Sequence, residues 1–264
     1  MERRLALMAG AGGLPGQAAA EATRQGWHVV ALTFDDATGL DPHVELVVPS
    51  SLTDMQAVLK TLTDQAVQAA LFVGKFWKKQ VFDHLDGTDE VGLRMARGGL
   101  SDEALSNVVL TTLGAMGIEV LDQRPFLSSW MMGAGTLTSR APSEAEWEEI
   151  HAGFSLARQM AAHRIGQTVV RSHGVTLAVE AAEGTDETIR RGARLAGRGA
   201  VVVKAVATEH DFRFDIPTVG RTTLEAMAEC GATALAVDGG KILLVDREAA
   251  LRLAEQAGIT LVGV

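Results

Sequence analysis

The chain of 264 residues is 47% hydrophobic and 22% charged, with a formal net charge of −9 and a single cysteine. These values allow a packed interior and exclude the basic surface that binding to a nucleic-acid backbone requires. They also exclude an intramolecular disulfide, which fits a reducing cytoplasm. Because no segment approaches the roughly 20 apolar residues of a membrane span, we expect a soluble, cytoplasmic protein without a nucleic-acid partner.

The first half of the chain alternates between short apolar runs and amphipathic helical runs. We expect strands at 5–9, 29–34, 46–48, 69–73 and 118–121, and helices at 17–25, 54–63 and 102–116. Such alternation predicts a parallel sheet covered by helices, which is a Rossmann-like α/β domain over residues 1–123. Residues 124–142 hold two of the six prolines with no clear period, which predicts a linker.

The second half, residues 143–264, predicts a mixed α/β domain. We expect helices at 144–163, 187–195, from about 221, and at 247–256, and strands at 167–170, 175–179, 200–206, 235–237, 242–245 and 260–262. Two strand pairs are expected to form hairpins. The first joins 167–170 to 175–179, and the second joins 235–237 to 242–245 through Asp238-Gly239-Gly240.

A glycine-rich loop follows the first expected strand and opens the first helix. Its glycines Gly10, Gly12 and Gly13 allow the backbone to approach a phosphate or sugar closely. The loop is not the dinucleotide fingerprint, because Pro15 stands where the third glycine of G-x-G-x-x-G would fall. A nucleotide pocket and a tight turn both remain open, as do a ligand contact and a solvated lysine face for Lys75, which follows a strand end.

Four carboxylates lie beside two turns that open predicted helices, namely Glu180, Glu183, Asp186 and Asp215. Carboxylates can hold a cation, and helix N-termini favour anions, so the pattern indicates metal-assisted chemistry on a phosphate. The structural alternative is helix capping by Thr185 or Asp186 together with solvation.

A lysine and a second helix start point to the same chemistry. Lys204 interrupts an apolar strand and, if it faces inward, needs a carboxylate partner or an anionic ligand. Thr218 and the N-terminus of the helix near Arg221 can meet phosphate oxygens, and Arg221 adds a fork-shaped donor. For Asp215 the alternative is a turn acid satisfied by local N–H groups.

Several motifs, mainly in the C-terminal half, carry a family resemblance: Ile165-Gly166-Gln167, Leu177 to Asp186, Lys204, Arg213 to Gly220, and Leu244 to Glu248. Together they resemble the UDP-2,3-diacylglucosamine pyrophosphatase family of lipid A biosynthesis, in the form unrelated to the metallophosphoesterases. The chain departs from the family pattern at Ala207 to His210, where the family has lysine-proline-x-glutamine.

The resemblance implies magnesium-dependent hydrolysis of UDP-2,3-diacylglucosamine, with water attacking the α-phosphorus to give UMP and 2,3-diacylglucosamine 1-phosphate (lipid X). It also implies two domains with the ligand between them. The essential acid of the family's Asp-Leu-Pro-Thr-Ile-Gly motif corresponds to Asp215. Peripheral contact with the inner face of the cell membrane and a homodimer are both left open.

These arguments give a set of expected site residues. A divalent ion and cationic side chains would stabilise the charge that grows on the leaving oxygen. We expect catalytic roles for Asp215, Lys204 and Arg221, substrate contacts from Gly10, Gly12, Gly13, Lys75, Gln167, Thr185 and Thr218, and Mg²⁺ ligands at Asp215, Glu183 and Asp186.

Two alternative functions remain. A Rossmann-like NAD(P)-dependent oxidoreductase would use the Gly10 loop and Asp35, but the chain has no tyrosine and hence no Tyr-x-x-x-Lys set. A non-catalytic lipid- or nucleotide-binding regulator could use the same scaffold, and it would retain its ligand without turnover.

Overall fold

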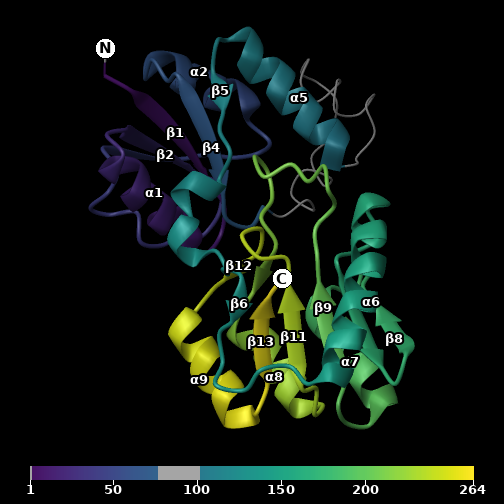
Figure 1. Cartoon of the computed structure of the whole chain (residues 1–264). Coiled ribbons are helices and arrows are strands. Elements are labelled where there is room, and N and C mark those ends of the chain that lie inside the picture. Colours follow the sequence, from purple (N-terminus) through teal and green to yellow (C-terminus); the bar gives the residue numbers. More distant parts are fainter. Residues whose placement is uncertain (1, 77–101) are drawn as a thin grey trace. The chain divides into compact units, whose positions relative to one another are not determined.

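The computed structural model describes residues 2–76 and 102–264 and divides the chain into two compact units (Figure 1). Unit 1 runs to Leu127 and also includes Asp211–Asp215, and unit 2 comprises Ser128–His210 and Ile216–Val264. Asp215 therefore groups with the N-terminal unit, although its sequence position suggested the C-terminal domain. Among the helices of the described ranges, none is long and apolar enough to cross a membrane.

Unit 1 is built on a five-stranded sheet in the order β3-β2-β1-β4-β5, in which neighbouring strands pair in parallel. The strands are β1 (Arg4–Ala9), β2 (His28–Thr33), β3 (Leu46–Pro49), β4 (Ala69–Val73) and β5 (Glu119–Val120). The helices in the described part of this unit are α1 (Leu14–Arg24), α2 (Met55–Asp64) and α5 (Asp102–Ala115). A 3₁₀ turn, η1 (Arg124–Phe126), follows. The expected parallel sheet covered by helices is confirmed.

The strand order reverses between β1 and β4. From β1 the chain builds outward through β2 and β3, and it then returns to place β4 on the other side of β1. Open α/β sheets bind ligands beyond the carboxyl ends of the strands at such a reversal, because the two loops there diverge and leave a crevice. The fold thus places the glycine-rich loop after β1 and Lys75 after β4 at the favoured edge of the sheet.

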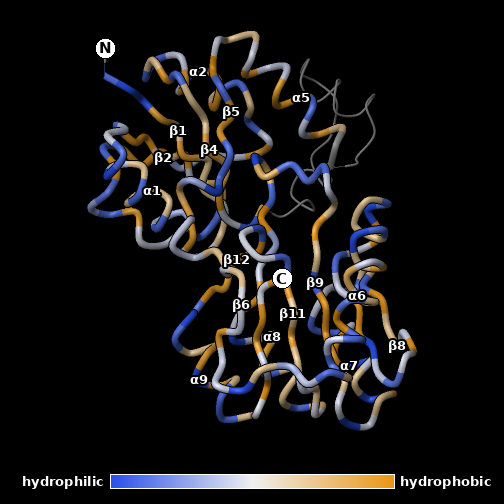
Figure 2. The backbone as a smooth tube through the Cα atoms, viewed as in Figure 1, coloured by the Kyte–Doolittle hydropathy of each residue, from blue (hydrophilic) through white to orange (hydrophobic). Residues whose placement is uncertain are grey.

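The central strands are apolar because both faces of the sheet are covered. β1 is buried from Leu5 to Ala9, and Figure 2 shows hydrophobic residues concentrated on the strands of both units. Helix α1 begins with Pro15 in its first turn, where the missing N–H costs nothing, and it buries the small side chains of Ala18, Ala19 and Ala22.

The segment Asp211–Asp215 is anchored in unit 1 by aromatic packing. Phe212 is buried beneath the guanidinium of Arg124, 4.1 Å from its ring centroid, and the carbonyl of Phe212 accepts a 3.1 Å hydrogen bond from the N–H of Gln123. The ring of Phe214 lies 5.4 Å from that of Phe72 in β4. Asp215, the next residue, is exposed.

Unit 2 contains a six-stranded mixed sheet in the order β6-β13-β11-β9-β7-β8. Its strands are β6 (Gly135–Thr136), β7 (Thr168–Ser172), β8 (Val175–Val179), β9 (Val201–Lys204), β11 (Ala234–Val237) and β13 (Thr260–Gly263). The helices are α6 (Glu144–Ala162), α7 (Thr185–Ala196), α8 (Arg221–Glu229) and α9 (Arg247–Ala257), with a short turn η2 (Ser128–Trp130). β9, β11 and β13 are mutually parallel, and β10 (Thr218–Val219) pairs separately with β12 (Leu243–Leu244).

One expected hairpin is confirmed and the other is wrong. β7 and β8 pair antiparallel as predicted, whereas β11 pairs in parallel with β9 and β13, and β12 pairs with β10. The reason lies in Asp238, which is 2% exposed and donates its N–H to the carbonyl of Lys204 instead of turning the chain back on itself. Of the expected linker, residues 124–142, the first four belong to unit 1 and include η1, and the rest contribute η2 and β6 to unit 2. β6 covers the edge of β13.

Glu146 stabilises the start of α6 through several hydrogen bonds. It completes a capping box with Ser143, accepts from Arg140 Nη1 at 2.7 Å and accepts from the hydroxyl of Thr233 at 2.7 Å. Burial alone would raise the pKa of the Glu146 carboxyl, but these hydrogen bonds outweigh it and lower the pKa to about 2.

We predict that Glu146→Gln lowers the free energy of unfolding by about 1–3 kcal/mol near neutral pH. Since the folded pKa lies below the ordinary value of 4.5, the carboxylate stabilises the fold above that value and loses its effect as the pH falls toward about 2. The difference between the parent and Glu146→Gln should therefore shrink across that range in urea denaturation. Glu144→Gln, an exposed acid in the same helical turn, is the control. A pH-independent difference would contradict the assignment.

Candidate active site

The glycine-rich loop of unit 1 is pressed against the loop that follows β4. The N–H of Gly10 donates to the carbonyl of Val73 at 2.9 Å, and Ala11 exchanges backbone hydrogen bonds with Lys75. A Cβ at Gly10 would lie 2.6 Å from the carbonyl oxygen of Lys75, and Gly74 has a φ of +99°. Gly10 is therefore required by the close approach of two backbones.

Gly12 and Gly13, in contrast, are exposed, and a Cβ at Gly12 would meet nothing within 4 Å. Gly13 is the N-cap of α1 and makes no side-chain cap, so the first-turn N–H groups of α1 have no side-chain acceptor there. The structure brings the exposed Lys75 beside this loop through its pairing with Ala11. Of the three glycines, Gly12 and Gly13 are therefore exposed, and their role in binding a ligand stays a prediction.

Lys204 is the centre of the polar cluster in unit 2. It is the last residue of β9 and is only 6% exposed. Its Nζ donates to Thr185 Oγ1 at 2.9 Å and to the carbonyl oxygen of Thr218 at 3.0 Å. The condition set for Lys204 in the sequence, that it faces inward, is met by its burial, and its ammonium contacts two of the expected substrate-binding residues, Thr185 and Thr218.

Two helices begin beside Lys204. α7 starts at Thr185 after Gly184, and α8 starts at Arg221, three residues after Thr218. Neither N-cap makes a side-chain hydrogen bond, whereas the N-caps of α2 and α6 do. First-turn N–H groups without a side-chain acceptor at two helix ends, next to a buried lysine, form a favourable place for an anion.

The structural alternative, in which Thr185 or Asp186 caps α7, is wrong. The N-cap is Gly184, with a φ of +83° that glycine adopts readily, and Thr185 is the first helical residue. Its hydroxyl donates to Glu180 Oε1 at 2.9 Å instead of accepting from the helix backbone.

Two of the other expected charged residues, Glu183 and Arg221, already have partners within unit 2. Glu183 accepts from Arg191 and from the hydroxyl of Thr188, at 3.2 Å for the latter, and a hydrogen bond to its own backbone N–H together with Arg191 lowers the pKa of its carboxyl. Arg221 Nε contacts Glu225 Oε1 at 2.7 Å on the exposed side of α8. The assignments of Glu183 as a metal ligand and of Arg221 as a phosphate clamp stay predictions.

The fit of a metal ion can be tested on the carboxylates. Across the described ranges, no group of three His, Cys, Asp or Glu side chains is arranged to hold a metal ion. Of the expected ligands, Asp215 belongs to unit 1, and Glu183 and Asp186 belong to unit 2. Mg²⁺ does not need three protein ligands, however, because it commonly binds one or two carboxylates together with substrate phosphates and water.

Gln167, an expected substrate-binding residue, contacts the polar cluster through its backbone atoms. Its N–H donates to Glu180 Oε2 at 3.3 Å, and its carbonyl accepts from the N–H of Ala205 at 3.0 Å.

Sequence reasoning missed the contacts of Asp238, whose carboxylate contacts Arg158 at 2.6 Å and accepts from the N–H of Val206 at 3.0 Å. Its position directly after a buried apolar run was the available signal.

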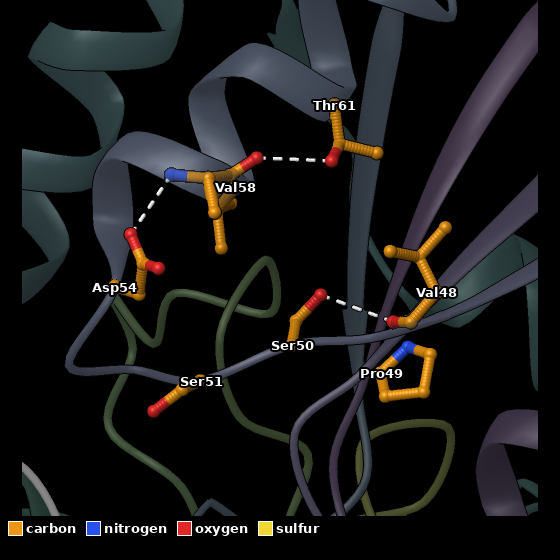
Figure 3. A pocket seen from close by; sticks show the side chains of 8 residues that line it. Val48, Pro49, Ser50, Ser51, Asp54, Val58 and Thr61 are labelled. Carbon is orange, nitrogen blue, oxygen red and sulfur yellow. Dashed lines mark hydrogen bonds between the residues drawn. The ribbon is translucent and has the colours of Figure 1, made fainter.

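A pocket of 330 Å³ lies where β3 ends and α2 begins, and Figure 3 shows its lining. None of the expected site residues lines it. Its hydroxyls are occupied locally, since Ser50 Oγ donates to the carbonyl of Val48 and Thr61 Oγ1 donates to that of Ala57. We assign it no role.

Parallel strands that end at uncapped, glycine-led helices, together with a buried lysine, define an α/β protein with sites suited to phosphate-type anions. The chain belongs to the LpxI family, because the LpxI N-terminal domain matches residues 4–130 and the LpxI C-terminal domain matches residues 133–262. It is 29% identical to the UDP-2,3-diacylglucosamine pyrophosphatase LpxI of Caulobacter vibrioides, over 99% of this chain and 98% of that protein.

Two solved structures are distantly similar to the chain. Glycinamide-RNase-transformylase T from Mycobacterium tuberculosis has a TM-score of 0.26 and 15% identity, with 68% of this chain and 44% of that chain covered. Phosphoribosylglycinamide synthetase from Anaerococcus prevotii has a TM-score of 0.26 and 14% identity, with 71% and 42% covered. The chain thus spans less than half the length of these structures, and similarities this low carry no functional argument.

We predict that Gly10→Ala destabilises unit 1 by about 1–3 kcal/mol, since the added methyl group would overlap the Lys75 backbone. The matched control is Gly13→Ala in the same loop, where a Cβ would meet only Thr38 Oγ1 at 3.7 Å. Denaturant unfolding of both variants checks this expectation. Equal stability of Gly10→Ala and the parent would show that the two loops are not held together as described.

Proposed function

We propose that the protein hydrolyses the pyrophosphate bond of UDP-2,3-diacylglucosamine to give UMP and lipid X. The relative that covers nearly the whole chain carries this activity in its name. Buried Lys204, beside the uncapped N-termini of α7 and α8, is the observation that carries the proposal, because it supplies what a diphosphate needs. Family membership does not favour the oxidoreductase alternative.

Unit 2 would bind the diphosphate. Lys204 and the first-turn N–H groups of α7 and α8 offer positive charge and donors, and Thr218 lies on the approach to α8. The surface ion pair of Arg221 with Glu225 is worth about 0–1 kcal/mol, so the guanidinium can exchange this partner for a phosphate at little cost. In unit 1, the exposed backbone at Gly12 and Gly13, with Lys75, would take the nucleotide end.

In the reaction, the oxygen of a water molecule forms a bond to the α-phosphorus, and the bond from that phosphorus to the bridging oxygen breaks. Lipid X leaves with the bridging oxygen, and UMP keeps the oxygen of the water. Asp215, whose carboxylate is exposed, would orient this water and accept its proton. Reaction in water enriched in the heavy oxygen isotope should label UMP, and label in lipid X would refute this direction of attack.

Magnesium remains part of the proposal. When bound, Mg²⁺ would neutralise charge on the diphosphate oxygens. Asp215 is the carboxylate proposed to hold Mg²⁺ together with the substrate. Asp186 and Glu183 are weaker candidates, because Asp186 lies in the first turn of α7 and Glu183 already contacts Thr188 and Arg191 of that helix. A substrate with two acyl chains also favours peripheral contact with the inner face of the cell membrane, in a cytoplasmic protein. This contact and a homodimer remain predictions.

We predict that Asp215→Asn folds normally and loses at least about 100-fold in UMP release, because the exposed side chain adds little packing while its carboxylate is needed for the reaction. The matched control is Asp211→Asn, which lies in the same segment and removes an exposed ion pair with Arg213. Activity of Asp215→Asn within tenfold of the parent, as an order-of-magnitude limit, would reject the role of Asp215.

We further expect a chelator to abolish UMP release and added Mg²⁺ to restore it, since the proposed ion would neutralise diphosphate charge in addition to Lys204 and the helix N-termini. The measurement is initial rate against free Mg²⁺ after treatment with EDTA. Calcium should substitute poorly because its larger, more flexible coordination shell fits the site less well. Full turnover in the presence of excess chelator would remove magnesium from the mechanism.

A further inference from the structure

Glu180 has no role in the site described so far, yet a single hydroxyl group connects it to Lys204. Glu180 Oε1 accepts from Thr185 Oγ1 at 2.9 Å, and Thr185 Oγ1 accepts from Lys204 Nζ at 2.9 Å. All three residues belong to unit 2 and come from the end of β8, the start of α7 and the end of β9. The chain of contacts therefore links three elements at the carboxyl end of β9.

The direction of these hydrogen bonds depends on the carboxylate. A threonine hydroxyl has one proton and two acceptor lone pairs. Glu180 Oε1 accepts the hydrogen bond that the Thr185 hydroxyl donates, so the lone pairs of the Thr185 oxygen remain to accept from Lys204 and from the hydroxyl of Thr168, at 3.5 Å. Without the carboxylate, the Thr185 proton could turn toward the Lys204 ammonium and repel it.

Backbone groups of β7 and of the residue before it hold Glu180 in place. Its Oε2 accepts the N–H of Gln167 at 3.3 Å, and its backbone N–H donates to the carbonyl of Thr168 at 2.8 Å. A Cβ at Gly166 would lie 2.2 Å from the carbonyl oxygen of Glu180, so only glycine lets these two segments approach so closely. This contact gives a physical reason for glycine within Ile165-Gly166-Gln167.

We propose that Glu180 and Thr185 are positioning residues that fix the ammonium of Lys204 at the carboxyl end of β9. Glu180 acts through Thr185. The kinetic consequence rests on the proposed function, whereas the positioning itself does not. In the active protein, correct placement of Lys204 affects the transition state more than ground-state binding, so its loss lowers kcat more than it raises KM.

Two substitutions break the connection at different points. Glu180→Gln presents one acceptor and one donor to the two donors that it faces, Thr185 Oγ1 and the N–H of Gln167, so one contact is mismatched. Thr185→Val keeps the shape of the side chain and removes the hydroxyl. Thr185→Ser keeps the hydroxyl and serves as the conservative variant, and Glu187→Gln, whose parent side chain pairs with Arg190 on the exposed side of α7, is the control.

The experiment is NMR of the lysine ammonium groups in the full chain, combined with steady-state kinetics of the same variants. The chain has six lysines, and Lys204→Arg identifies the signal of Lys204. A buried, hydrogen-bonded ammonium exchanges its protons with water more slowly than an exposed one. We expect a slowly exchanging Lys204 signal in the parent, in Thr185→Ser and in Glu187→Gln, and a shifted or rapidly exchanging signal in Glu180→Gln and Thr185→Val.

The kinetics should follow the signal, with kcat lowered about 10- to 100-fold in Glu180→Gln and Thr185→Val and KM changed far less. An unchanged Lys204 signal in both variants would overturn the proposal, as would an altered signal in Glu187→Gln. If the signal responds as expected but the parent releases no UMP, the positioning network stands and the proposed function fails.

Discussion

The burial of the Lys204 side chain at the end of β9 constrains the rest of unit 2. A charged group removed from water costs several kcal/mol unless hydrogen bonds replace its hydration. Thr185 Oγ1 and the carbonyl of Thr218 supply two of these bonds, and they do so from the first residue of α7 and from the strand that leads into α8. The hydrogen bonds of one buried lysine thus connect the first residue of α7 and the strand before α8 to the end of β9.

The parts of the fold that depend on local pattern were predictable. A parallel sheet is indicated by the apolar runs of β1, β2 and β4 and by the glycines in the loops that follow β1 and β4. Strands that are covered on both faces lack the alternation of polar and apolar residues. The second hairpin was wrong because Asp238-Gly239-Gly240 has the composition of a tight turn. Its aspartate is instead buried against Arg158 and the backbone of Val206, contacts that are distant in sequence.

The polar cluster around Lys204 was predictable in part by residue type, but not in the way its members contact one another. A buried lysine must have a partner, so Lys204 could be singled out from its apolar strand, but Thr185 and Thr218 follow only from how the elements meet. Glu180 and Glu183 look equivalent in the sequence. One is connected to Lys204 through a hydroxyl, and the other is paired with Arg191 along α7. Local sequence cannot distinguish these two glutamates, because their partners are set by how the loop between β8 and α7 packs against α7.

The placement of Asp211–Asp215 in unit 1 has a consequence for biosynthesis. A ribosome completes residues up to Leu127 long before it reaches Phe212 and Phe214, the side chains that pack against Arg124 and Phe72. Although domains generally fold as units during translation, starting from the N-terminus, the N-terminal unit here lacks part of its packing until most of the C-terminal unit has been translated. The motif that contains Asp215 therefore joins its unit only late in synthesis.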